Sequence, residues 1–171
     1  MHNPGLDSPT PHTFMKEAIK QAIQALEQDE VPIGVVIVHQ NRIIARAYNQ
    51  TNMLKDPTAH AEMIAITQAA SHLGYERLLD TQLYSTIEPC VMCFGAIVQA
   101  RIDHVYYGAA NEKYGACGSV VNLLHAPWNH HPNVMAGMME EDCRFLMQEF
   151  FRKKRRGRDS NPGTGFSPLP T

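Results

Sequence analysis

The sequence predicts a three-layer α/β/α domain, in which helices cover both faces of a mixed central sheet of about five strands. Three observations support this fold class. Segments with helical periodicity lie between short β-branched segments, a tight turn joins two strands in the first third of the chain, and strands then alternate with helices. The length of 171 residues suits one such domain, because domains typically contain about 100–200 residues.

The first third of the chain predicts a helix followed by a β-hairpin. Apolar residues from Phe14 to Gln28 recur at helical spacing, and Thr13 is a candidate N-cap. The β-branched segment 33–38 predicts a buried strand. Gln40-Asn41 predicts a hairpin turn into a second strand over 42–48.

The rest of the chain predicts alternating strands and helices after a polar loop that ends at residues 55–58. Gly74 is expected to end one helix, and Pro89 is expected in the first turn of the next. Residues 108–133 are rich in loop-forming residues. The expected elements are helices over 59–73, 89–100 and 140–156 and strands over 82–86, 104–107 and 133–137.

The two ends of the chain are expected to lie outside the domain, which spans residues 14–156. Residues 1–13 are polar and predict a flexible segment without the apolar region of a signal peptide, so we expect a cytoplasmic protein. Gly, Pro and Ser dominate 157–171, which predicts a disordered tail. No apolar run approaches the ~18 residues that span a membrane. Four cysteines in such a chain argue against a disulfide framework.

Two short motifs contain residue types that bind metals. His60 and Glu62 form a His-Ala-Glu motif, and Cys90 and Cys93 form a C-x-x-C pair. Cysteines three residues apart share one face of a helix, and the first turn of a helix stabilises thiolates. A catalytic zinc ion takes three protein ligands and keeps a fourth position for water. His60, Cys90 and Cys93 therefore predict one zinc ion per subunit.

The combined pattern H-x-E…P-C-x-x-C is the signature of zinc-dependent nucleobase deaminases. Zinc lowers the pKa of its bound water to about 7, which produces hydroxide at neutral pH. We expect Glu62 to take the proton from this water, pass it to the ring nitrogen and later protonate the leaving ammonia.

Other interpretations of these residues stay open. A zinc deaminase that acts on a free base or nucleoside, such as guanine or cytosine, would share the metal site. A non-catalytic RNA-binding or scaffold protein with structural zinc would need a fourth protein ligand, and Cys117, Cys143 and His125 are the candidates. Small apolar packing residues are the simpler interpretation of Cys117 and Cys143.

The sequence resembles the bacterial tRNA-specific adenosine deaminase family of the cytidine/deoxycytidylate deaminase superfamily. The resemblance implies a cytidine-deaminase-like fold and a homodimeric tRNA adenosine(34) deaminase, a hydrolase that acts on C–N bonds. It further implies conversion of adenosine to inosine at the wobble position of an arginine tRNA. The similarity extends from about Phe14 to Arg156 and is carried by the segments 30–34, 56–62, 88–93 and 115–119.

The resemblance also implies roles for residues around the metal site. By position, Asn49 corresponds to the asparagine that binds the target nucleotide, and Val31 and Ile87 correspond to walls of the base pocket. A loop asparagine and two core residues would be the structural alternative. Asn111 stands where the family commonly has aspartate, in the loop that meets the RNA backbone, and Lys113 follows it. The asparagine removes a negative charge there.

A basic segment near the C-terminus predicts contact with the anticodon stem-loop of tRNA. Residues 152–158 contain six of the 15 basic side chains, and such side chains neutralise phosphates. Phe150 and Phe151 precede them and could stack on bases or face the core instead. Four side chains of the segment are candidate RNA contacts: Arg152, Lys153, Lys154 and Arg155.

Overall fold

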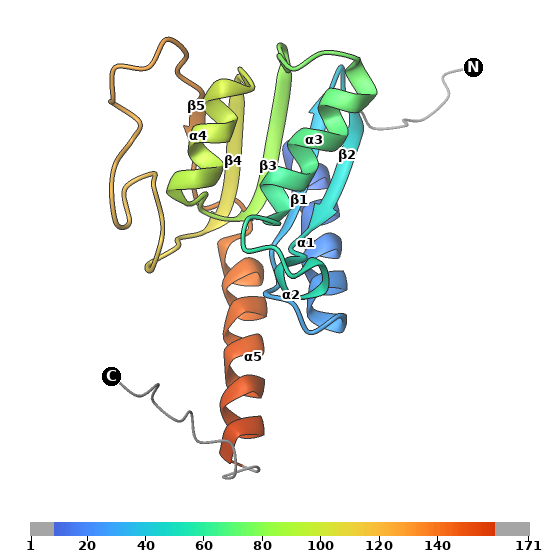
Figure 1. Cartoon of the computed structure of the whole chain (residues 1–171), viewed down its shortest axis with the longest axis vertical. Helices are drawn as coiled ribbons and strands as arrows, with labels where there is room; N and C mark the ends of the chain where they lie inside the picture. The colour runs from blue at the N-terminus through green and yellow to red at the C-terminus, as the bar shows by residue number, and fades with distance from the viewer. Residues whose placement is uncertain (1–8, 160–171) are drawn as a thin grey trace, which may run out of the picture.

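The computed structural model describes residues 9–159. It confirms the three-layer fold, because helices cover both faces of a mixed five-stranded sheet (Figure 1). The strand order is β2-β1-β3-β4-β5, and β1 runs antiparallel to both of its neighbours, whereas β3, β4 and β5 are parallel. The strands are β1 (Gly34–His39), β2 (Arg42–Tyr48), β3 (Thr81–Ile87), β4 (His104–Ala109) and β5 (Asn133–Met135).

The hairpin between β1 and β2 has the predicted turn. Gln40 and Asn41 have φ angles of 49° and 58°, as the two central residues of a type I′ turn require. The register shifts by one residue between Ile37 and Val38, so a bulge lies close to the turn.

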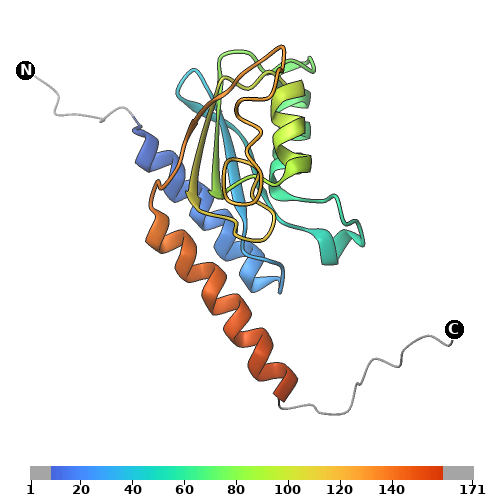
Figure 2. The same ribbon diagram turned by 90° about the vertical axis from the view of Figure 1, so that its left-hand side faces the viewer.

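Two helices lie on each face of the sheet. Figure 2 shows α1 and α5 together on one side of the strands and α3 and α4 on the other. The helices are α1 (Pro11–Glu27), α2 (Thr51–Leu54), α3 (Ala61–Leu73), α4 (Val91–Gln99) and α5 (Glu140–Asp159). In the part of the chain that the structure describes, no helix is both long and apolar enough to span a membrane.

Strand β1 is buried on both faces because it lies inside the sheet between two layers of helices. Val35 and Ile37 belong to the core under α3 and α4, and Val36 and Val38 belong to the core under α1 and α5. This alternation is the two-residue period of a strand. A buried central strand thus accounts for the continuous apolar run in the sequence.

The predicted N-cap of the first helix is wrong. Helix α1 begins at Pro11, and its N-cap is Thr10 rather than Thr13. The two threonines form a capping box, in which each side-chain oxygen lies 3.3 Å from the backbone nitrogen of the other residue. Proline at the first helical position has no N–H to leave unpaired. Residues 11–13 are therefore helical, although the sequence predicts a flexible segment there.

Other element boundaries differ from the prediction by a few residues. Helix α4 begins after Cys90, so Pro89 precedes the helix instead of lying in its first turn. Helix α2 lies in the segment that the sequence predicts to be a loop. Helix α5 continues to Asp159, which is three residues beyond its predicted end. The rest of the predicted tail, from residue 160 onward, lies outside the described residues.

Candidate active site

The three predicted zinc ligands meet at the starts of two helices on one face of the sheet. His60 is the N-cap of α3, Cys90 is the N-cap of α4, and Cys93 lies in the first turn of α4. Strand β3 leads directly into this turn, so Cys90 follows the carboxyl end of a parallel strand. The donor atoms of the three side chains lie within 4.8 Å of one another.

The distances between these donor atoms fit zinc. Nδ1 of His60 lies 3.7 Å from Sγ of Cys90 and 3.5 Å from Sγ of Cys93. Zinc–nitrogen and zinc–sulfur bonds of about 2.0 and 2.3 Å at a tetrahedral angle place nitrogen and sulfur about 3.5 Å apart. Two thiols and one imidazole are also the donor types that zinc prefers. His60, Cys90 and Cys93 are thus positioned to bind this ion.

The surroundings of the two thiols shift their pKa values in opposite directions. A hydrogen bond from Cys93, helped by His60, lowers the pKa of Cys90 to about 4, although burial acts in the opposite direction. The same hydrogen bond and burial raise the pKa of Cys93. Binding of a metal ion displaces the protons that remain on the two thiols.

Glu62 lies beside the zinc ligands, in the first turn of α3. It is 2% exposed, and its Oε2 atom has no hydrogen-bond partner among the described residues. Burial raises the pKa of Glu62 to about 7. A carboxyl group with such a pKa can both accept and donate a proton at neutral pH.

A cavity of about 710 Å³ opens next to these residues. His60, Cys90 and Glu62 line it, and so do the three predicted substrate-binding residues: Val31, Asn49 and Ile87. Asn49 is buried, and its Oδ1 atom lacks a hydrogen-bond partner among the described residues, as Oε2 of Glu62 does. Two unpaired buried polar atoms in one cavity favour a ligand that forms hydrogen bonds.

Comparison with known proteins identifies the family. The cytidine and deoxycytidylate deaminase zinc-binding region matches residues 9–109. The tRNA-specific adenosine deaminases of Streptococcus pyogenes and Agrobacterium fabrum are each 48% identical to this chain over 143 residues, which are 83% of this chain and 90% and 94% of those proteins. The chain belongs to the tRNA-specific adenosine deaminase family. It is a zinc-binding deaminase.

Solved structures agree with this assignment. A structure from a study of A-to-I editing by tRNA:A34 deaminases at the wobble position matches with a TM-score of 0.76 and 46% identity, over 78% of this chain and 97% of that chain. A guanine deaminase from Bacillus subtilis matches with a TM-score of 0.57 and 42% identity, over 59% of this chain and 65% of that one. The more extensive match is to the tRNA deaminase.

The candidate fourth zinc ligands of the structural-zinc hypothesis lie elsewhere in the deaminase. Within residues 9–159, the group of three metal-binding side chains consists of His60, Cys90 and Cys93 alone. Cys143 is buried in the core under α1 and α5, on the opposite face of the sheet. Cys117 packs against the core of α4. The described residues thus supply three ligands.

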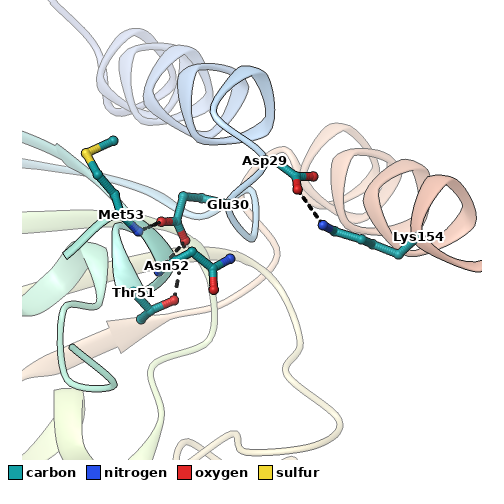
Figure 3. A network of polar contacts seen from close by, with 6 residues as sticks. All are labelled: Asp29, Glu30, Thr51, Asn52, Met53 and Lys154. Atoms are coloured by element: carbon teal, nitrogen blue, oxygen red, sulfur yellow. Dashed lines mark hydrogen bonds and ion pairs between the residues drawn. The ribbon is translucent and has the colours of Figure 1, made fainter. Parts of the chain in front are cut away.

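The predicted RNA contacts of the deaminase divide into two groups. Asn111, Lys113 and Arg155 line the cavity, whereas Lys153 is exposed outside it. Arg152 and Lys154 form ion pairs of 2.6 Å with acidic side chains of the deaminase itself. The partners are Glu149 for Arg152 and Asp29, beyond the end of α1, for Lys154 (Figure 3).

The two phenylalanines of α5 face different surroundings. Phe150 is 5% exposed, whereas Phe151 is 46% exposed and lines the cavity. Arg144, Met147 and Gln148 line the cavity from the same helix face, and none of them was predicted from the sequence. These residues and Phe151 are spaced three and four positions apart, and this spacing indicates that they share one face of the helix.

Two buried glutamates without a predicted role organise the cavity walls. Glu30 accepts hydrogen bonds from the backbone N–H groups of Asn52 and Met53, at 3.2 and 2.6 Å, and from the hydroxyl of Thr51 (Figure 3). These bonds cap α2, where backbone N–H groups would otherwise stay unpaired. Glu88 likewise accepts hydrogen bonds from backbone N–H groups, which here belong to the segment 111–119.

The side chain of Asn111 has a local structural role. Oδ1 of Asn111 accepts a hydrogen bond of 3.0 Å from the backbone N–H of Tyr114, and Nδ2 lies 3.5 Å from the carbonyl oxygen of Glu88. An aspartate could accept the first bond but has no N–H to donate in the second. The amide thus ties the start of this loop to the end of β3.

Proposed function

We propose that this protein deaminates adenosine to inosine at the wobble position of a tRNA anticodon, with an arginine tRNA as its substrate. The observation that carries the proposal is the continuity of the cavity, which extends from the zinc ligands and Glu62 to cationic side chains of α5 and the loop after β4. The relatives named for tRNA-specific adenosine deamination support the same substrate.

The chemistry at the base is hydrolysis of a C–N bond. When bound by His60 and the two cysteines, zinc supplies a Lewis acid that activates water at neutral pH. Glu62 takes one proton from the attacking water and transfers it to the ring nitrogen of adenine. The C–N bond to the amine then breaks, and Glu62 delivers the second proton of the water to the departing group. Adenosine and water thus give inosine and ammonia.

The cavity walls orient the nucleotide. Val31 and Ile87 flank the base with apolar surface, and the unpaired Oδ1 of Asn49 accepts a hydrogen bond from the nucleotide. The base must leave the anticodon stack to enter, which costs little in a single-stranded loop. Lys113 and Arg155 line the cavity and neutralise phosphates of the anticodon stem-loop. The family resemblance further supports a homodimer, and a tRNA substrate supports action in the cytoplasm.

The second candidate is deamination of a free base or nucleoside. The likeness to a guanine deaminase favours it, and the metal site would be the same. A free base, however, has no phosphate for Lys113 and Arg155 to neutralise. Incubation of the zinc-loaded protein with tRNA, guanine, cytosine and adenosine distinguishes the two, with Glu62→Gln as the control. We expect ammonia from tRNA alone, and release from the small molecules alone would overturn the proposal.

A further inference from the structure

The side chain of Glu88 holds together a long irregular segment of the cavity wall. Glu88 directly follows β3 and is fully buried. Its Oε2 atom accepts a hydrogen bond of 3.0 Å from the backbone N–H of Asn111, and Oε1 accepts bonds of 2.8 and 3.2 Å from the N–H groups of Cys117 and Ser119. The hydroxyl of Ser119 donates a fourth bond to Oε2.

The segment 111–119 faces the substrate cavity and contacts the metal-binding turn. Asn111, Lys113 and Tyr114 line the cavity. On the other side, the N–H of Ala116 donates a bond of 2.9 Å to the carbonyl oxygen of Pro89, next to a zinc ligand. The segment contains no helix or strand, so the carboxylate supplies acceptors that a regular element would otherwise provide.

A carboxylate suits this position because it only accepts hydrogen bonds. Its two oxygens have about four lone pairs, which match the four donors. Glutamine would present an NH₂ group to at least one N–H donor.

Gly115 belongs to the same arrangement. A Cβ atom at this position would lie 2.5 Å from Cδ and from Oε2 of Glu88, which is closer than nonbonded atoms approach. The glycine therefore gives the carboxylate room to reach its donors. A side chain at position 115 would displace the carboxylate without changing its chemistry.

We propose that Glu88 is a positioning residue that fixes the 111–114 wall of the cavity for binding of the RNA substrate. The inference rests on the proposed function, because it assigns this wall to RNA. It predicts that loss of the carboxylate weakens substrate binding while zinc binding and proton transfer persist. A role in general stability alone would instead lower the amount of active enzyme and leave KM unchanged.

The test compares Glu88→Gln, Ser119→Ala and the matched control Glu17→Gln, whose carboxylate pairs with Lys20 on α1. Zinc content, hydrogen exchange of the backbone amides of 111–119, and kcat and KM for tRNA are measured. We expect Glu88→Gln to retain one zinc ion, exchange faster at Asn111, Cys117 and Ser119, and raise KM about tenfold with kcat within about threefold of the wild type. Ser119→Ala should change KM in the same direction by less.

Several results would overturn the role of Glu88. These are unchanged exchange with an unchanged KM, loss of zinc from Glu88→Gln, or a fall in kcat alone. If Glu88→Gln fails to fold, Ser119→Ala decides by the same measurements. If the wild type does not deaminate tRNA, the proposed function fails, and unchanged exchange at 111–119 would then reject the positioning role by itself.

Discussion

Nδ1 of His60 lies 3.5 Å from Sγ of Cys93, although 33 residues separate them in the chain. The two side chains come from the starts of α3 and α4, which cover the same face of the sheet. Each motif alone is ambiguous, because a C-x-x-C pair also occurs in redox and structural zinc sites. The contact between them turns two ambiguous motifs into one site with three zinc ligands.

Removal of a ligand should abolish zinc binding. We expect Cys93→Ala to lose the zinc ion, because two remaining ligands hold it poorly. Cys117→Ala is the control and should retain one ion per chain, because Cys117 lies outside the ligand group. Metal analysis by mass spectrometry measures both. Loss of zinc from Cys117→Ala would instead support the structural-zinc hypothesis.

Glu62→Gln should separate metal binding from proton transfer. Glutamine has nearly the same shape but cannot accept and return a proton, so turnover should fall by about 10²–10⁴-fold while zinc content stays unchanged. Glu17→Gln on α1 is the control and should keep wild-type turnover. Near-normal turnover of Glu62→Gln would contradict the assigned proton transfer.

Two neighbouring cations of α5 should differ in their effect on RNA binding. Arg155 lines the cavity, whereas Lys154 forms an ion pair with Asp29. We expect Arg155→Ala to weaken tRNA binding more than Lys154→Ala and to reduce the salt dependence by about one phosphate contact. Binding titrations at several salt concentrations measure this. Equal effects of the two variants would show that the ion pair with Asp29 does not keep Lys154 from binding RNA.

The two phenylalanines should differ in the property that they affect. Phe150 is buried, so Phe150→Ala should lower the free energy of unfolding by about 3 kcal/mol. Phe151 is half-exposed in the cavity, so Phe151→Ala should chiefly raise KM for tRNA, because a base-stacking contact is worth about 1–3 kcal/mol. Thermal unfolding and steady-state kinetics measure the two effects. A loss of stability in Phe151→Ala together with a raised KM in Phe150→Ala would contradict the orientation of α5.

The fold and the metal site could be predicted because their signals are local. The helical spacing of apolar residues in α1, the continuous apolar run of β1 and the turn at Gln40-Asn41 each lie within one short segment. The prediction of the metal site depended on residue types with few functions, since one histidine and two cysteines brought together are typical of a zinc site. Helix α2 could not be predicted in the same way, because four residues show no period.

The roles of the buried glutamates depend on distant partners. Glutamate is seldom fully buried, so the sequence alone favours an exposed position for Glu30 and Glu88. Their donors lie 21–31 residues further along the chain, and neither spacing matches a known motif. The α5 face was predictable in principle, because the helical spacing of Arg144, Met147, Gln148 and Phe151 places the four side chains on one side of a helix.

The most direct test of the proposed function is sequencing of an arginine tRNA after treatment with the zinc-loaded protein, because inosine is copied as guanosine. Glu62→Gln provides the matched control. We expect the wobble adenosine to be recorded as G after treatment with the wild type and as A after treatment with the variant. Adenosine retained at the wobble position after treatment with the wild type would contradict the account.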